Sequence, residues 1–340
     1  MTLLSATDRG LFCEAGGFHV DPWSAVDRAI VTHAHGDHAT RGCAAYLAAA
    51  PGVGVLRRRL GPDARVRGIE YGESLDIHGV RVSLHPAGHI LGSASVRIEH
   101  GGEVWVVSGD YKTEPDPTCA PYEPIRCHTF VTECTFGLPI YRWPDSARVF
   151  GGINEWWRAN QEAGRATLLF GYALGKAQRL IAGLDPTLGP ILTHGAVESM
   201  TAAYRDAGVV LPPTTHVAAA GRTAWTRGII VAPPSAHGST WARRFGPRST
   251  GFASGWMALR GERRRSSVDR GFPISDHVDW PALLDAIAAT GAERVWATHG
   301  YTESLARWLR EHGVDARAIA TRYQGESEET AEPGDGEPAA

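Results

Sequence analysis

The sequence predicts a mixed α/β fold, an αββα sandwich interrupted by an inserted α/β domain, with the last segment of the chain returning to complete the sandwich. Two observations support this prediction. Residues 1–145 contain short apolar strands separated by glycine and aspartate, with few helical repeats. From residue 146 onward, strands alternate with helices, which is typical of a parallel sheet with helical crossovers. We therefore expect the sandwich at residues 1–145 and 272–322, and the inserted domain at 146–271.

In the first part, strands are expected at residues 17–20, 29–32, 80–84, 95–99 and 103–107. The last two are joined by a turn at Gly101-Gly102, since two glycines suit a tight hairpin. Residues 40–50 are rich in alanine, the best helix former, and they predict a helix directly after a run of histidines.

In the inserted part, we expect helices at 146–163, 174–183 and 197–207, and strands at 166–170, 190–193, 228–232 and 250–254. The returning segment predicts helices at 280–289 and 302–311, with strands at 294–298 and 314–320. Residues 323–340 contain six acidic residues and no basic one, so they are expected to form a disordered acidic tail.

The composition is that of a globular protein, with 340 residues of which 43% are hydrophobic. No apolar run is long enough to cross a membrane and the start of the chain has no export signal, so a cytoplasmic location is the default expectation. The five cysteines include no Cys-x-x-Cys pair, which argues against a thiolate zinc site. Of 34 basic residues only Lys112 and Lys176 are lysine; arginine suits phosphate binding, although a GC-rich coding bias accounts for it equally well.

The most informative motif places His33, His35, Asp37 and His38 within six residues. Imidazole nitrogen and carboxylate oxygen suit zinc or manganese, and a run without thiolates indicates a catalytic metal site. Further candidate ligands lie at the ends of expected strands or in glycine-rich loops, namely His89, Asp110 and His299. Asp110 is the one among these whose side chain could bridge two cations.

These motifs resemble those of the metallo-β-lactamase superfamily, in its β-CASP branch, over almost the whole chain. The resemblance implies two divalent ions, zinc or manganese, and a fixed set of ligands: His33, His35 and His89 on one ion, Asp37 and His38 on the other, Asp110 between them, and His299 completing the second site. It also implies that Asp21 orients the ligand loop without binding a metal.

Two further residues separate the nucleic-acid branch from lactamases and thioesterases. Glu133, in Thr-Glu-Cys-Thr-Phe-Gly, resembles the acidic motif of the branch, and His277, in Ser-Asp-His-Val-Asp, resembles its middle histidine. Together with Asp37 they are the predicted catalytic residues: His277 would protonate the leaving oxygen or bind the phosphoryl oxygens, and Glu133 would fix its tautomer. Segments 171–179 and 253–257 resemble signatures of the insertion, and Gly175, Lys176 and Ser254 are the expected substrate contacts.

Within the branch, residues 134–143 look most like bacterial ligase-associated DNA exonucleases, which are often labelled as messenger-RNA 3′-end processing factors. The resemblance therefore implies a metal-dependent nuclease, a DNA exonuclease in DNA repair, with nucleic acid as its main partner and a DNA ligase and a helicase as further partners. Three alternatives stay open: an RNA-processing nuclease with the same site, a hydrolase of small thioesters or lactams, and an inactive nucleic-acid scaffold.

The remaining candidate residues have simpler interpretations. His194 imitates the motif of His299 but falls in the insertion, so it is expected to be structural or to face substrate, and His85 is expected to be a non-ligand beside the loop of His89. The arginine clusters at 57–59, 243–244 and 263–265 are expected to be mainly solvated faces.

Overall fold

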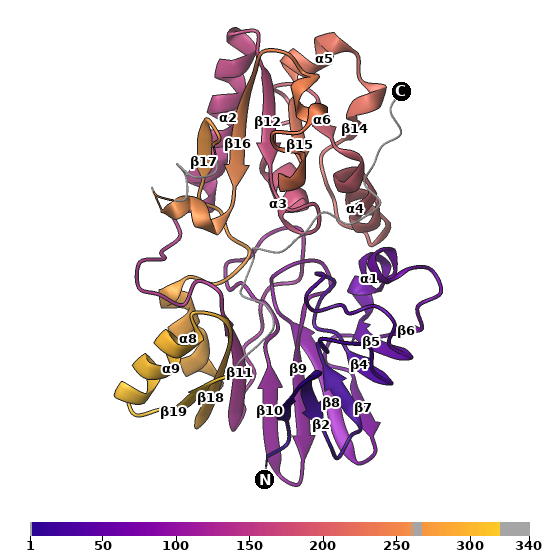
Figure 1. Cartoon of the computed structure of the whole chain (residues 1–340), viewed down its shortest axis with the longest axis vertical. Helices are drawn as coiled ribbons and strands as arrows, with labels where there is room; N and C mark the ends of the chain where they lie inside the picture. Colours follow the sequence, from indigo (N-terminus) through magenta and orange to yellow (C-terminus); the bar gives the residue numbers. More distant parts are fainter. Residues whose placement is uncertain (1, 260, 262–266, 320–340) are drawn as a thin grey trace. The chain divides into compact units, whose positions relative to one another are not determined.

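The computed structural model describes residues 2–259, 261 and 267–319. The expected acidic tail and the arginine cluster at 263–265 lie outside the described residues. The described residues divide into two compact units, 2–141 with 277–319 and 142–276. Residues 272–276, which the sequence assigns to the sandwich, thus lie in the second unit. Figure 1 labels most of the helices and strands of both units.

The first unit contains two sheets. In the first sheet six strands follow one another in sequence order, antiparallel from β1 to β3 and parallel from β3 to β6. Their bounds are β1 Ser5–Thr7, β2 Gly10–Cys13, β3 Phe18–Val20, β4 Arg28–Ile30, β5 Ala45–Ala49 and β6 Val66–Ile69. A 3-10 turn, η1 (Ala50–Gly52), leads into helix α1 (Val53–Leu60), which contacts β6.

The second sheet has the order β19-β18-β11-β10-β9-β8-β7. Strands β7 to β10 form an antiparallel meander, whereas β10, β11, β18 and β19 run parallel. The bounds are β7 Ser74–Ile77, β8 Val80–Pro86, β9 Ala94–His100, β10 Glu103–Val107, β11 Thr129–Cys134, β18 Arg294–Gly300 and β19 Asp315–Ala318.

The two sheets of the first unit enclose one apolar core. Phe18, Val20 and Ile30 from the first sheet pack in one buried cluster with Val82 and Val96 from the second. Because successive side chains of a strand point to opposite faces, the neighbouring positions of these strands face away from this core.

The opposite face of the second sheet is covered by helices α8 (Trp280–Thr290) and α9 (Thr302–Glu311). Leu283 of α8 and Leu305 of α9 share a buried cluster with Phe130 and Val295 of the sheet. Figure 1 labels both helices beside β11 and β18; both contact β11, and α9 also contacts β18. Two packed sheets with helices outside them confirm the mixed α/β fold class.

One sequence-based prediction is wrong. The alanine content of residues 40–50 predicts a helix, but Ala45–Ala49 form strand β5, which pairs in parallel with β4 and β6. Four of its five residues are buried, so burial between two strands outweighs the helix propensity of alanine. The nearby helix is α1, which begins at Val53.

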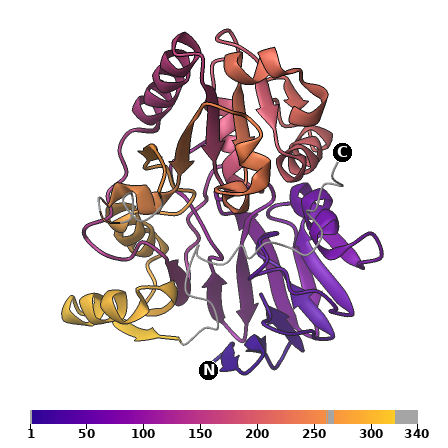
Figure 2. The same cartoon turned by 45° about the horizontal axis from the view of Figure 1, so that its top comes forward.

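The second unit is a six-stranded parallel sheet of order β14-β13-β15-β12-β16-β17. Leu169 of β12 faces helices α2, α3 and α4, whereas Leu168 and Phe170 face the side covered by α5 and α6. The strands are β12 Ala166–Phe170, β13 Ile191–Thr193, β14 Thr214–His216, β15 Ile229–Ala232, β16 Arg248–Ala253 and β17 Arg270–Phe272. The helices are α2 Ser146–Glu162, α3 Lys176–Gly183, α4 Gly195–Asp206, α5 Arg222–Arg227 and α6 Thr240–Arg243. Figure 2 shows these elements from a second direction.

None of the helices within the described residues combines the length and apolar character that a membrane span requires.

Candidate metal centre

The candidate ligands converge from three loops of the first unit, each of which follows the carboxyl end of a strand, and from the last residues of a fourth strand. The run from His33 to His38 follows β4, and His89 lies between β8 and β9. Asp110 follows β10, and His299 is the next-to-last residue of β18. Loops held by a packed pair of sheets place these side chains on a rigid scaffold.

The first cluster comprises His33, His35, His89 and Asp110. Nδ1 of His35 lies 3.0 Å from Nε2 of His33 and 3.1 Å from Nε2 of His89. Oδ2 of Asp110 lies 3.4 Å from Nε2 of His33 and 3.8 Å from Nε2 of His89. Four ligands held about 2.0–2.1 Å from a tetrahedral ion are separated by about 3.3 Å, so these distances fit a shared cation.

The second cluster comprises Asp37, His38 and His299, with Asp110 next to it. Nε2 of His38 lies 3.6 Å from Oδ2 of Asp37 and 3.5 Å from Oδ2 of Asp110. The rings of His38 and His299 stack with centroids 5.0 Å apart. The same oxygen of Asp110 therefore faces both clusters, as a bridging carboxylate would.

Asp21 fixes the orientation of His38. Its Oδ2 lies 2.7 Å from Nδ1 of His38 and accepts a hydrogen bond of 2.6 Å from Oγ1 of Thr32, while its Oδ1 accepts one of 2.8 Å from the Thr32 amide. A carboxylate at this position keeps the proton on Nδ1 and leaves the lone pair of Nε2 facing the cluster. Nε2 is buried and has no hydrogen-bond partner among the described residues, which is the state of a nitrogen prepared for a metal.

The electrostatics of the clusters favour cations. Burial lowers the pKa of His33 well below its ordinary value and also lowers the pKa of His299, which keeps both imidazoles in the neutral, ligating form. Burial opposes ionisation of Asp110, but His38, His277 and His33 outweigh it and hold the pKa of this carboxyl well below its usual range. His38 is buried too, yet the charges of Asp110, Asp37 and Asp21 raise its pKa well above the ordinary value, so the cluster is rich in negative charge.

The last ligand is held in an unusual backbone conformation. His299 has φ 53°, and the next residue, Gly300, has φ 83°. A Cβ on Gly300 would overlap the carbonyl oxygen of Cys134, so only glycine fits there. The thiol of Cys134 donates to the carbonyl oxygen of His299 across 3.0 Å and thereby ties the end of β18 to β11.

Glu133 and His277 form a third group with Asp110. Oε1 of Glu133 lies 2.8 Å from Nδ1 of His277 and also accepts a hydrogen bond of 3.0 Å from the Tyr111 amide, while Oε2 accepts one of 3.2 Å from the Thr135 amide. Because two amides already donate to this carboxylate, it acts as an acceptor and His277 donates through Nδ1. The ring of His277 lies 4.8 Å from that of His89.

The expected substrate contacts lie in the second unit and are buried. The side chain of Lys176 is 1% exposed, and its ammonium group donates to Oδ2 of Asp276 at 2.9 Å and to the carbonyl oxygen of Ile274 at 3.2 Å. Gly175 precedes α3 with φ 85°, and the hydroxyl of Ser254 accepts from the Trp256 amide. Substrate contact by these three residues stays a prediction.

Two supporting residues carry little signal in the sequence. Thr32 holds Asp21 by backbone and side chain, and its position directly before the histidine run is the only signal it offers. Cys134 reads in the sequence as a small core or surface residue, whereas its contact with His299 joins positions 165 residues apart in the chain. The non-ligand interpretation of His85 agrees with the geometry, since its ring faces Ser83 and Glu123.

Fold and site together define an α/β protein of two units, in which the first unit, built on two packed sheets, carries a candidate dinuclear metal centre. A protein of Opitutus terrae named Probable DNA ligase is 31% identical over 318 residues, which cover 93% of this chain and 31% of that protein. Endoribonuclease YSH1 of Yarrowia lipolytica is 30% identical over 125 residues, 36% of this chain and 15% of that protein. Cleavage and polyadenylation specificity factor 73 of Drosophila melanogaster is 32% identical over 124 residues, 36% of this chain and 18% of that protein. With these relatives and its ligand motifs, the chain belongs to the β-CASP branch of the metallo-β-lactamase superfamily.

Two further comparisons bear on the fold. No family model matches the chain. A crystal structure of a protein of unknown function from Enterococcus faecalis V583 superposes with a TM-score of 0.56 at 12% identity, covering 88% of this chain and 80% of that one, which indicates a shared fold alone. The chain spans about a third of the length of the first relative and less than a fifth of the other two.

Proposed function

We propose that the chain is a metal-dependent nuclease that hydrolyses phosphodiester bonds, and that it acts as a DNA exonuclease in DNA repair. The observation that carries this proposal is the pair Glu133–His277. It lies beside the two ligand clusters, with candidate atoms of Asp110, Glu133 and His277 within 4.8 Å of one another. A nuclease needs a proton donor for the leaving oxygen in addition to metal ligands, and this pair is suited to that role.

Seven side chains would hold two divalent ions, zinc or manganese: His33, His35, His89, Asp37, His38, His299 and Asp110. When bound, two such ions supply charge neutralisation at the phosphate and an activated water. Asp37 is the more exposed of the two carboxylates in this set, with 26% of its side chain accessible against 8% for Asp110.

His277 holds or delivers a proton at Nε2. Its Nδ1 faces Glu133, so the chemistry at the phosphate is assigned to Nε2. Glu133 in turn is fixed by the Tyr111 and Thr135 amides and cannot rotate without breaking two hydrogen bonds. The pair is therefore preorganised, and the proton at Nε2 can pass to the departing oxygen or stabilise a phosphoryl oxygen through a hydrogen bond.

DNA is the favoured substrate because the relative that matches 93% of the chain is named as a probable DNA ligase. The same match makes a DNA ligase a reasonable functional partner, and a helicase and a cytoplasmic location stay predictions. RNA is the second candidate, because the relatives that match 36% of the chain are named as endoribonucleases or as a cleavage and polyadenylation factor.

The test is digestion of matched single-stranded DNA and RNA of one sequence, each labelled at the 5′ or the 3′ end, with Zn²⁺ or Mn²⁺. We expect metal-dependent shortening of the DNA from one end. Preference for RNA would replace the DNA assignment with the second candidate. Turnover of a thioester or lactam that survives His277→Ala, with no cleavage of either strand, would refute the nuclease proposal.

A further inference from the structure

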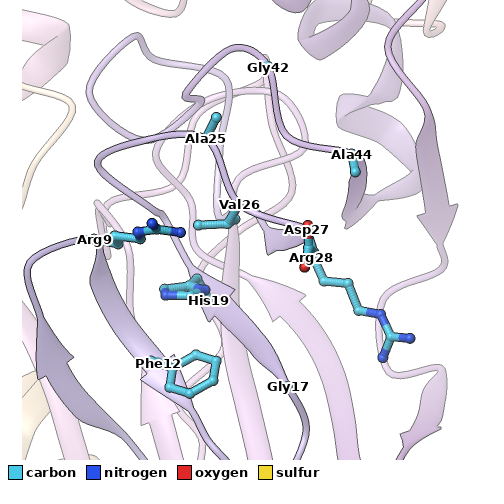
Figure 3. Close-up of a pocket in the computed structure, with 10 residues that line it drawn as sticks. All are labelled: Arg9, Phe12, Gly17, His19, Ala25, Val26, Asp27, Arg28, Gly42 and Ala44. Carbon is cyan, nitrogen blue, oxygen red and sulfur yellow. The ribbon is translucent and has the colours of Figure 1, made fainter.

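A second concave site lies in the first unit, on the face of the first sheet that points away from the core. The cavity has a volume of about 520 Å³ and is lined chiefly by Arg9, Phe12, His19, Val26, Asp27 and Arg28. Figure 3 shows these side chains around the cavity. The volume falls in the range of about 300–1,000 Å³ found for small-ligand sites.

The floor of this cavity is an aromatic pair. Phe12 of β2 and His19 of β3 are directly paired across the antiparallel strands, and their ring centroids lie 4.6 Å apart at 35°. Their strand neighbours Cys13, Phe18 and Val20 are buried in the core. Because successive side chains of a strand point to opposite faces of the sheet, Phe12 and His19 face away from the core. Both rings are half-buried, which leaves π-faces accessible to a flat group.

The walls of the cavity carry more positive than negative charge. Arg9 lies in the turn between β1 and β2, Arg28 begins β4, and both are exposed. The guanidinium of Arg9 makes no hydrogen bond or ion pair with the described residues, and Nη1 of Arg28 contacts only Nε2 of His78, at 3.0 Å. Burial and the charge of Arg9 lower the pKa of His19 against the opposing charge of Asp8, which favours a neutral ring. Asp27 is the single carboxylate of the lining.

We propose that this cavity is a second contact for single-stranded nucleic acid, in which one base stacks on Phe12 and His19 while the adjacent phosphates bind Arg9 and Arg28. Guanidinium groups match phosphate oxygens and aromatic rings accept any base, which is how proteins hold single strands without reading sequence. A cation is disfavoured by the two arginines. An apolar protein partner is disfavoured because the large exposed hydrophobic side chains of the described residues, Ile140 and Val210, lie elsewhere. The choice of ligand rests on the proposed nuclease function.

The experiment measures binding of the intact, metal-loaded chain to a fluorescent oligodeoxythymidylate with phosphorothioate links, which keep their charge and resist hydrolysis. Arg9→Ala with Arg28→Ala is compared with Arg67→Ala, an exposed arginine of β6 outside the cavity. The double variant loses two phosphate contacts, so the slope of the logarithm of the association constant against the logarithm of the salt concentration becomes shallower by about 1.4. Arg67→Ala leaves this slope unchanged. Phe12→Leu keeps the apolar volume and weakens binding at least about fivefold without changing the slope. An abasic strand binds the parent chain and Phe12→Leu equally.

An unchanged slope in the double variant, or an equal fall in Arg67→Ala, would overturn the inference. Displacement of the strand by thymidine monophosphate at the same molar concentration would also overturn it, since the site would then hold free nucleotides. Hydrolysis of bis(p-nitrophenyl) phosphate, a small diester, reports the metal centre separately. If the double variant loses strand binding while the parent chain cleaves no diester, the inference stands and the nuclease proposal fails. If the double variant keeps strand binding while the parent chain cleaves the diester, the inference fails and the nuclease proposal stands.

Discussion

The Asp21→Asn substitution is expected to weaken metal binding without altering the ligands themselves. Asn retains an oxygen for the Thr32 amide and tolerates the φ of 44° found at this position, so the backbone is preserved. Its NH₂ group, however, replaces the oxygen that accepts the Nδ1 proton of His38. If His38 changes tautomer to accept from that NH₂ group, its proton moves to Nε2, where it blocks the metal.

Loss of such an orienting carboxylate typically weakens metal affinity about 10–100-fold, or by about 1.4–2.7 kcal/mol. The assay is titration of the metal-free chain with Zn²⁺ in competition with a chromogenic chelator, with thermal unfolding to confirm that the variant is folded. Asp63→Asn, which alters an exposed carboxylate outside the clusters, is the matched control and leaves affinity unchanged. Equal affinity of Asp21→Asn and the parent chain for both ions would refute the role of Asp21.

Three further substitutions test the framework. Gly300→Ala should lower the unfolding free energy by about 2–5 kcal/mol in chemical denaturation, because the new Cβ overlaps the carbonyl oxygen of Cys134 and the backbone φ is left-handed. Gly313→Ala is the control: it has a similar φ of 84° but lies in open space, and it should cost about 1–2 kcal/mol. Cys134→Val should lower the unfolding free energy by about 1–3 kcal/mol because the partly buried carbonyl of His299 loses its donor. Cys134→Ser keeps a donor and should recover most of that loss; equal losses in the two variants would contradict the hydrogen bond. Lys176→Met should lower the unfolding free energy by about 1–3 kcal/mol, since Asp276 loses one buried partner and keeps Arg179. A variant with unchanged stability but weaker strand binding would favour a phosphate contact instead.

Regular elements with strong local patterns were predictable from the sequence. The strand Glu103–Val107, the strand Ala166–Phe170 and the helix Thr302–Glu311 have the bounds expected from apolar alternation and periodicity. Strand β5 was not predictable, because the alanine content of residues 45–49 favours a helix and only the neighbouring strands favour extension. Strand β11, which carries Glu133, gave no distinct signal either, since it is buried on both faces and shows no alternation.

For the candidate centre, the metal ligands were predictable from the sequence, whereas most of the contacts that support them were not. Ligand types were readable because three imidazoles and a carboxylate within the run from His33 to His38 are typical of a metal site, and the structure brings His89, Asp110 and His299 to it. The family resemblance assigned an orienting role to Asp21, but the partners that hold the centre in place were not readable from the sequence. The contacts of Asp21 with Thr32 and of Cys134 with His299 depend on side-chain geometry between segments that are separate in the sequence. Neither threonine nor cysteine indicates a supporting role at a metal centre by its residue type alone.

The central claim is that two metal clusters and the Glu133–His277 pair form one phosphodiesterase site, and the comparison of the parent chain with His277→Gln tests it most directly. End-labelled single-stranded DNA is digested with Zn²⁺ or Mn²⁺, while bound metal is measured on the same samples. We predict that His277→Gln binds the metal of the parent chain and cleaves about 10²–10⁴-fold more slowly, because glutamine cannot deliver a proton. Cleavage at the parent rate by this variant, or cleavage by the parent chain without metal, would contradict the claim.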